Sequence, residues 1–311
     1  MGIVTAISLG VDDVASWCVE RLGSAPEVEL FRTGYLSSVI GVVLHDGRKV
    51  VVKLRPPAER LSACFAVHRA LFDRGFPCPE PLVGPCPLGR WAATAEGFVL
   101  GGSLLPDSGR QAGPYAEALA RLLAAAPRVQ QINSLEPAPP WTAWNHPGPG
   151  LWPWPDDREL DLNQVDGPGW LDDAAARVRD RLAHSTARPV VGHGDWYGGN
   201  LRWRGTELHT VHDWDSVIAA PETIVVGLAG AVYPATGGPG EEATVEETEE
   251  FLARYEAAAD RPFTGHERED TWAAGLWVRA FDAKKQFASD ALIHALGEDE
   301  CLRRLGLAGL C

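Results

Sequence analysis

Apolar and polar positions divide the chain into a first part with short strand-like runs and a longer second part with helical periodicity. Up to residue 99, β-branched runs alternate with turn residues, and helices are expected only near residues 11–22 and 58–74. Beyond the pair Gly101-Gly102, expected helices cover residues 114–126, 170–183, 245–258 and 270–296. We therefore predict an α+β fold, with a small antiparallel β-sheet in residues 1–99 and a mainly helical part in residues 100–311.

A β-hairpin is the clearest local signal in the first part. The pair Asp46-Gly47 separates two β-branched runs, and a two-residue turn there would place Lys53 opposite Ile40. Lys53 would then lie beside the glycine- and serine-containing loop of residues 34–38, which leads into the hairpin. A proline-rich connection over residues 77–87 is expected to follow, before a strand that ends near residue 99.

A second hairpin is predicted in a glycine-rich polar stretch of the helical part. Two short apolar runs flank the turn Gly205-Thr206, and pairing around that turn sets Asn200 opposite Val211. Asn200 and Asp213 then leave the same end of one hairpin, and Asp195 lies on the loop that enters it. This oxygen-rich group is typical of a Mg²⁺ site beside a nucleotide, because Mg²⁺ takes one or two carboxylates and completes its shell with phosphate oxygens and water.

Composition and charge narrow the classes of partner. Hydrophobic residues make up 45% of the chain and charged residues 23%, which is typical of a folded globular protein. Lysine and arginine number 28 against 42 aspartate and glutamate residues, a net charge of −14. A field of that sign repels phosphate backbones and anionic lipid headgroups, so we expect neither nucleic acid nor a membrane as a partner.

The cysteines and the amino terminus favour a cytoplasmic protein. The six cysteines form no C-x-x-C pair, and a chain of 311 residues can build a core without disulfide bonds. The first residues lack the basic region of a signal peptide. The longest uncharged run, residues 223–240, contains five glycines and two prolines and is too short in its apolar core to span a membrane.

Four motifs, taken together, resemble one family. Residues 193–200 read HGDWYGGN and fit the pattern H-G-D-x-x-x-x-N, and Asp213-Trp214-Asp215 follows as a D-x-[DE] motif. With the loop of residues 34–38 and Lys53, these motifs stand in the order typical of the aminoglycoside phosphotransferase and choline kinase branch of the protein-kinase-like fold. The resemblance covers most of the chain. It implies a two-lobe kinase fold and an ATP-dependent kinase that phosphorylates a hydroxyl group of a small molecule.

The resemblance also implies site residues. The catalytic base would be Asp195; the Mg²⁺ ligands would be Asn200, Asp213 and Asp215; the ATP-binding residues would be Gly34, Ser37, Ser38, Lys53, Glu96 and Phe98. Transfer of a γ-phosphoryl group through a loose transition state needs mainly positioning and charge neutralisation, which these residue types supply. The chain departs from the family pattern in two places. The glutamate that usually pairs with the lysine falls on Cys64, and Glu59 is the nearest upstream acid. Residues 220–229 also lack the acidic residue that many relatives have before the pair Leu228-Ala229.

Two other classes of function compete with the kinase reading. A nucleotide-binding pseudoenzyme usually lacks the base or a metal ligand, and neither is missing here. A metallophosphoesterase needs an upstream D-x-H metal pair, and the chain contains no such tripeptide. The kinase reading is therefore the leading prediction, with antibiotic resistance as one setting in which such a kinase acts.

The acceptor is predicted only by class. The negative charge and the acidic stretch of residues 241–250 favour a cationic hydroxylated compound such as an aminoglycoside or amino sugar, while neutral sugars, choline-like alcohols and other antibiotics stay open. Trp277 and Phe281 share a helix face that forms either core or a wall for a sugar ring, and Asp282 lies at its margin. The tryptophan-rich segment of residues 135–168 is expected to pack as a lid, with stacking on the substrate as the alternative. The sequence does not predict the oligomeric state.

Overall fold

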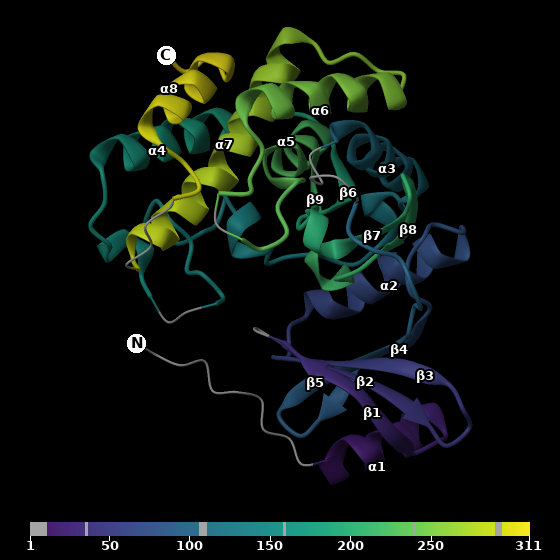
Figure 1. Ribbon diagram of the computed structural model, residues 1–311. Coiled ribbons are helices and arrows are strands. Elements are labelled where there is room, and N and C mark those ends of the chain that lie inside the picture. The colour runs from purple at the N-terminus through teal and green to yellow at the C-terminus, as the bar shows by residue number, and fades with distance from the viewer. Residues whose placement is uncertain (1–10, 35–36, 106–110, 158–159, 239, 290–293) are drawn as a thin grey trace.

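The computed structural model describes residues 11–34, 37–105, 111–157, 160–238, 240–289 and 294–311. Figure 1 shows a β-sheet with one helix on its outer face at one end of the molecule and a larger group of helices at the other end. Helix α2 (Arg60–Asp73) lies between the two. The predicted α+β fold, with a small antiparallel sheet and a mainly helical second part, is confirmed. The division of the chain at residue 99 stays a prediction.

The sheet contains the strands expected from the β-branched runs. Among the described residues, five antiparallel strands follow the order β1 (Pro26–Thr33), β2 (Ser38–Leu44), β3 (Lys49–Arg55), β5 (Trp91–Gly97) and β4 (Pro81–Leu88). Helix α1 (Val11–Leu22) packs its Trp17 and Cys18 on one face of this sheet, against Val52 and Leu54. Because side chains alternate along a strand, Lys53 and Arg55 leave β3 on the opposite face, toward the helical part.

The register of the first hairpin differs by one residue from the prediction. Lys53 lies opposite Val39, and Ile40 pairs with Val52. The loop has three residues, 45–47. The Leu44 N–H donates to the Arg48 carbonyl at 2.8 Å and closes the loop. Gly47 takes the left-handed conformation (φ 85°) that such a three-residue turn requires at its last position.

The proline-rich connection is itself a strand. Residues 81–88 form β4, which lies at the edge of the sheet and pairs only with β5 among the described strands. Proline lacks the N–H that a central strand must donate on both sides, and an edge strand tolerates this loss. The pairing is interrupted on either side of Val83, as the prolines in this strand require.

The helical part begins after the glycine pair. Its helices are α3 (Ala112–Ala125), α4 (Gly169–Ala183), α5 (Glu222–Val232), α6 (Val245–Ala258), α7 (Gly265–Phe287) and α8 (Glu298–Leu307). Two antiparallel strand pairs accompany them, β6 (Pro189–His193) with β9 (Val217–Pro221) and β7 (Leu201–Arg204) with β8 (Glu207–Val211). Short 3₁₀ helices cover Val129–Gln131, Pro140–Thr142, Leu162–Gln164, Gly198–Asn200 and Trp214–Ser216.

Capping residues fix where the late helices begin. Helix α6 starts as predicted, because Thr244 and Glu247 form a capping box. Helix α7 starts five residues earlier than expected, since Thr264 and Glu267 form a second capping box that the sequence reading missed. It also ends earlier, at Phe287, and α8 is an additional helix.

Two further expectations concern disulfide bonds and membranes. All six cysteines are free thiols. Within the described residues, none of the helices combines the length and the apolar character needed to cross a membrane.

A buried arginine joins α2 to the helical part. Arg60, only 8% exposed, donates from Nε to the Leu135 carbonyl at 3.0 Å and from Nη1 to the Asp215 carbonyl at 2.5 Å. Its Nη2 donates to the carbonyl of Val217. One guanidinium thus satisfies three carbonyls from two segments far away in the sequence. Helix α2, which follows the sheet in the chain, is thereby fixed to the segment that carries the D-x-D motif.

Replacing Arg60 by methionine should destabilise the protein by about 3 kcal/mol, because buried carbonyls would lose their donors. Urea unfolding measures this free energy. The matched control is Arg69→Met on the same helix, whose half-exposed side chain lies 4.0 Å from Asp73 and should contribute less than about 0.5 kcal/mol. Equal stability of the two variants would contradict the role given to Arg60.

Candidate active site

The second hairpin brings the predicted site residues together. Leu201, and not Asn200, lies opposite Val211. The pairing follows the prediction next to the turn, but an irregularity between Arg202 and Trp203 shifts it by one residue further along the hairpin. The His212 N–H donates to the Asn200 carbonyl at 2.9 Å, so the pairing continues one residue further. Asn200 and Asp213 therefore still leave the same end of the hairpin, as predicted, although the predicted partner of Asn200 was wrong.

Asn200 holds the predicted base in place. Its amide nitrogen donates to Asp195 Oδ2 at 2.8 Å and to the Asp195 carbonyl at 2.9 Å. With the nitrogen so used, the amide oxygen is the atom of Asn200 that a cation could bind. Burial raises the pKa of the Asp195 carboxyl to about 7; the charge of Asp213 adds to this effect and the hydrogen bond from Asn200 opposes it.

His193 organises the loop that enters the hairpin. The ring is 1% exposed; Nε2 lies 3.0 Å from the His212 carbonyl, and Nδ1 accepts from the Asp195 N–H at 3.2 Å. These partners require the tautomer with hydrogen on Nε2. Both ring nitrogens are thus engaged by backbone groups, which indicates a structural role for this histidine and not that of a proton carrier.

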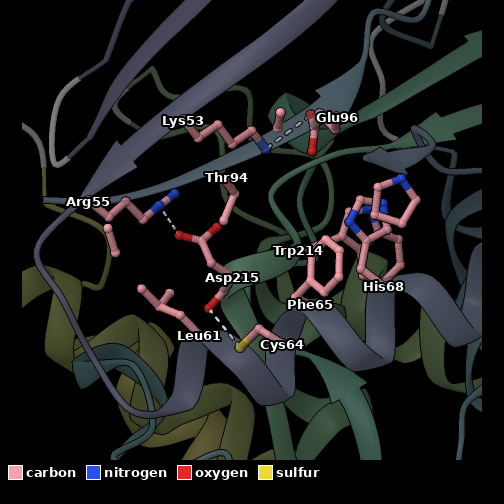
Figure 2. A pocket seen from close by; sticks show the side chains of 13 residues that line it. Lys53, Arg55, Leu61, Cys64, Phe65, His68, Thr94, Glu96, Trp214 and Asp215 are labelled. Atoms are coloured by element: carbon pink, nitrogen blue, oxygen red, sulfur yellow. Dashed lines mark hydrogen bonds and ion pairs between the residues drawn. The ribbon is translucent and has the colours of Figure 1, made fainter. Parts of the chain in front are cut away.

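Arg55, which the sequence reading missed, meets both carboxylates of the D-x-D motif. Its Nη2 donates to Asp213 Oδ1 at 2.9 Å, and its Nε contacts Asp215 Oδ2. Figure 2 shows this guanidinium pointing at Asp215 from the end of β3. Asp213 has left-handed backbone geometry (φ 64°), and its Oδ2 accepts from the Ser216 hydroxyl at 3.3 Å. Burial alone would raise the pKa of Asp213, but the positive charges of Arg55 and Lys53 outweigh it and lower that pKa.

The partner of Lys53 lies on a neighbouring strand. Lys53 Nζ is 3.2 Å from Glu96 Oε1, a pair visible in Figure 2. Glu96 lies on β5 opposite Val51, two residues from Lys53 and on the same face of the sheet. The alternative partner considered from the sequence was Glu59. Cys64, at the position of the usual glutamate, instead places its Sγ 3.6 Å from the Asp215 carbonyl.

The other predicted nucleotide-binding residues lie at or next to the ends of strands in the sheet. Gly34 (φ 140°) allows a tight fold, since a Cβ there would lie 1.8 Å from the Ser37 carbonyl oxygen. Tyr35 and Leu36 of the predicted loop lie outside the described residues. Ser38 begins β2 opposite Leu54. The Phe98 N–H donates to the Lys49 carbonyl at 3.0 Å, so this donor is already used within the sheet.

The donor set of the D-x-D segment fits a hard divalent cation. Asp213 and Asp215 supply carboxylate oxygens and Asn200 an amide oxygen, the ligand types that Mg²⁺ prefers. Asp215 Oδ1 is buried without a hydrogen-bond partner among the described residues, as expected of an atom in a cation site. The part of the chain that the structure describes contains no group of three or more His, Cys, Asp or Glu side chains placed to hold a metal ion. The remaining ligands would thus come from phosphate and water.

A cavity of about 620 Å³ adjoins Asp195 on the side of the helical part. Trp141 lines it and donates from Nε1 to the Gly194 carbonyl at 2.8 Å. Acidic side chains also line it, namely Asp156, Asp157, Asp195, Glu242 and Asp282, together with the cation Lys285. Lys285 Nζ lies 2.6 Å from Asp157. Burial raises the pKa of Asp282 to about 6; the charges of Glu242 and Asp157 also raise it, and Lys285 opposes them.

A second cavity, of about 550 Å³, shares Trp141 and Asp156 with the first. Its other walls are rich in proline and include Trp154, which is 62% exposed. The tryptophan-rich segment therefore does more than pack as a lid. Trp152 is buried and stacks on Trp277 with ring centroids 5.6 Å apart, whereas Trp141 and Trp154 face cavities.

The acidic stretch of residues 241–250 contributes less to this cavity than its composition suggests. Glu241 accepts from the Thr236 N–H, Glu247 caps α6, and Glu249 pairs with Arg268 at 2.7 Å. Glu242 is the member of the stretch that lines the cavity. Of the aromatic pair considered as a wall, Trp277 belongs to the core and Phe281 lines the cavity.

Comparison with known proteins assigns the family. The chain belongs to the phosphotransferase enzyme family, whose sequence profile matches residues 27–269. This confirms the resemblance to the aminoglycoside phosphotransferase and choline kinase branch, and the protein is a phosphotransferase. The comparison with curated protein sequences returned no match.

Solved structures of the same fold agree with this assignment. They include an amicoumacin kinase with AMP-PNP and Ca²⁺ (TM-score 0.63, 12% identity, 94% of this chain and 92% of that chain). A spectinomycin phosphotransferase with ADP and spectinomycin has a TM-score of 0.57 at 13% identity, over 95% and 93% of the two chains. A macrolide 2′-phosphotransferase type I has a TM-score of 0.54 at 18% identity, over 99% of both. At these identities the similarity establishes the protein-kinase-like fold.

Replacing His193 by alanine should lower the free energy of unfolding by about 2–4 kcal/mol, because the buried ring and two backbone hydrogen bonds are lost. Urea unfolding together with kcat tests this. His266→Ala is the control, since that side chain is 94% exposed. A His193 variant of unchanged stability whose kcat falls by orders of magnitude would show that the ring takes part in the chemistry.

Proposed function

We propose that the protein is an ATP-dependent kinase that transfers the γ-phosphoryl group of ATP to a hydroxyl group of a small molecule. The observation that carries this proposal is the position of Asp195. It lines the 620 Å³ cavity and is hydrogen-bonded to Asn200 on the hairpin that ends at Asp213. A carboxylate between a cavity and a cation site can face an acceptor on one side and a phosphoryl group on the other.

The proposed roles follow from the charge and position of each residue. Asp195 is the base: it orients the acceptor hydroxyl and receives its proton. Lys53 supplies a positive charge for the nucleotide phosphates. Asn200, Asp213 and Asp215 would hold Mg²⁺, which neutralises phosphate charge when bound. Glu96 orients Lys53, in the place of the helix glutamate of relatives.

The remaining predicted contacts extend this assignment. Gly34, Ser37 and Ser38 would line the phosphate groups, and the backbone near Glu96 and Phe98 would lie beside the adenine. We also propose the division into a nucleotide-binding lobe, residues 1–99, and a lobe with the catalytic loop and acceptor site, residues 100–311. The change from sheet to helices supports this division, as does the positive-φ pair Gly101-Gly102 between them.

The acceptor is proposed to be cationic. Five acidic side chains and one lysine line the cavity beside Asp195, so an ammonium group would find carboxylate partners there. The second cavity, with its proline and tryptophan walls, would hold an apolar part of the same acceptor. Structural neighbours that bind spectinomycin or phosphorylate macrolides and amicoumacin support a hydroxylated, antibiotic-like compound.

An acceptor panel tests the function directly. Release of ADP from Mg²⁺-ATP would be measured with spectinomycin, hygromycin B, a macrolide, a fructosamine and choline as acceptors. We expect the rate of ADP release to increase when at least one cationic hydroxylated compound is added. Binding of Mg²⁺-ATP without turnover on any panel member would favour a nucleotide-binding pseudoenzyme.

The variant Asp195→Asn should lower kcat by about 10²–10⁴-fold and leave Mg²⁺-ATP affinity close to that of the wild type, because the asparagine cannot accept the proton. Calorimetry and steady-state kinetics give the two quantities. Asp173→Asn, on the exposed side of α4, is the matched control. A near-normal kcat for Asp195→Asn would assign the base to another residue.

The affinity for a cationic acceptor should fall at low pH. Asp282 has a pKa of about 6, so its carboxylate is ionised above that pH and becomes protonated below it. We expect KM for the cationic acceptor to rise by up to about tenfold per pH unit between pH 6 and 4 as the ammonium group loses this partner. In Asp282→Asn, KM should be higher at pH 7 and should depend less on pH between pH 6 and 4 than in the wild type. An unchanged pH profile in the variant would exclude Asp282 from acceptor binding.

A further inference from the structure

Arg55 lies where a cation would be needed. It is the last residue of β3, two residues after Lys53, so both side chains leave the same face of the sheet. Its guanidinium donates to Asp213 Oδ1 at 2.9 Å and contacts Asp215 Oδ2 (Figure 2). A single positive group thus bridges the two carboxylates that the D-x-D motif offers to a metal ion.

The contact is poorly satisfied as an ion pair. A guanidinium binds one carboxylate most strongly through two parallel hydrogen bonds, but here it is divided between two carboxylates. Asp215 Oδ1 is buried without a hydrogen-bond partner among the described residues, and the contact of Arg55 Nε with Asp215 Oδ2 is an ion pair without hydrogen-bond geometry. The Arg55 side chain is 23% exposed and that of Asp213 is 29% exposed, so the pair is partly open to solvent.

Arg55 and a metal ion cannot use this place together. A divalent cation on Asp213 would need the carboxylate that accepts the hydrogen bond from Arg55. Two cations at contact distance would also repel each other strongly in a partly buried site. Arg55 must therefore move when a metal ion binds to these carboxylates.

Phosphate groups are the natural new partner for Arg55. The proposed nucleotide site places phosphates beside Lys53, on the face of the sheet from which Arg55 also extends. The planar guanidinium fork matches phosphate oxygens in a way that a lysine cannot. Partner exchange would keep every charge in the cleft paired, since the metal ion takes the carboxylates while Arg55 takes the phosphates.

We propose that Arg55 is a phosphate-binding residue that, without nucleotide, occupies the cation position between Asp213 and Asp215. This inference rests on the proposed function. Arg55 blocks metal ions that arrive alone and releases the carboxylates when nucleotide phosphates attract it. Metal ion and nucleotide therefore bind as a pair, and each increases the affinity for the other by the same factor.

The experiment measures metal binding without nucleotide. Binding of Mn²⁺ to the full-length protein is followed by electron paramagnetic resonance for the wild type, Arg55→Met and Arg48→Met. Arg48 is the control, because it pairs with Asp46 at the exposed hairpin turn far from the D-x-D motif. We expect Arg55→Met to bind Mn²⁺ about tenfold more tightly than the wild type and Arg48→Met to bind it equally.

Nucleotide binding provides the second measurement. Calorimetry with Mg²⁺-ATP should show an affinity lowered about tenfold in Arg55→Met, so the variant moves the two affinities in opposite directions. Arg55→Lys, which keeps the charge without the fork, should bind Mn²⁺ like the wild type and Mg²⁺-ATP with intermediate affinity. If Arg55 had only a structural role, the affinities for Mn²⁺ and for Mg²⁺-ATP would both fall. The midpoint of thermal unfolding would then also be lower in Arg55→Met and in Arg55→Lys.

Each outcome decides the proposal. Unchanged or weaker Mn²⁺ binding in Arg55→Met, with thermal unfolding like that of the wild type, overturns it. If Arg55→Met does not fold, Mn²⁺ binding by Arg55→Lys that is weaker than in the wild type overturns it in the same way. Failure of the proposed function can be distinguished from failure of the Arg55 proposal, because in that case the wild-type protein would bind no Mg²⁺-ATP.

Discussion

The hydrogen bonds of the Arg60 guanidinium are the constraint on which the rest of the site depends. They hold α2 against the segment after Asp213, and other contacts of the same helix follow from them: His68 stacks on Trp214 at 5.2 Å, and Cys64 approaches the Asp215 carbonyl. Helix α2 in turn packs beneath the sheet face that carries Lys53 and Arg55 (Figure 2). Arg60 thus helps to fix the distance between the sheet cations and the D-x-D carboxylates.

Charge is distributed differently on the two sides of Asp195. On the side of the proposed nucleotide site, Lys53 and Arg55 are paired with Glu96, Asp213 and Asp215, so cations and anions nearly balance. Such a balanced cleft can accept a phosphate chain and a metal ion together by exchanging partners, without leaving a buried charge alone. On the side of the proposed acceptor cavity, carboxylates exceed cations, which would suit an ammonium-bearing compound. The two substrates of the proposed reaction therefore meet opposite electrostatic environments.

The local parts of this arrangement could be predicted from the sequence. The loop of residues 193–200 closes on itself within a few residues, through Asn200 and Asp195, so its motif fixes its geometry. The capping box at Thr244 acts over three residues and placed α6 correctly. Both hairpin turns were predicted, but each predicted register was wrong by one residue. The first hairpin has a third loop residue and the second has an irregularity in its pairing, and neither feature changes the hydrophobic pattern of the sequence.

The long-range parts could not be predicted in this way. Arg55 meets Asp213 across 158 residues of sequence and Arg60 meets Leu135 across 75, and no periodicity links such positions. The pair of Lys53 with Glu96 depends on the order of strands in the sheet, in which β5 and not β4 adjoins β3. The two missed arginines share a position: Arg55 ends a strand and Arg60 begins a helix, and among the described residues their hydrogen-bond acceptors lie far away in the sequence.

A crystal structure with Mg²⁺ and AMP-PNP would test most directly that these distant contacts form one phosphoryl-transfer site. The account predicts phosphates beside Lys53, the metal ion on Asp213 and Asn200, Arg55 turned from Asp213 to the phosphates, and Arg60 unchanged. A nucleotide bound elsewhere, or a metal-nucleotide complex in the cleft with Arg55 still on Asp213, would contradict it.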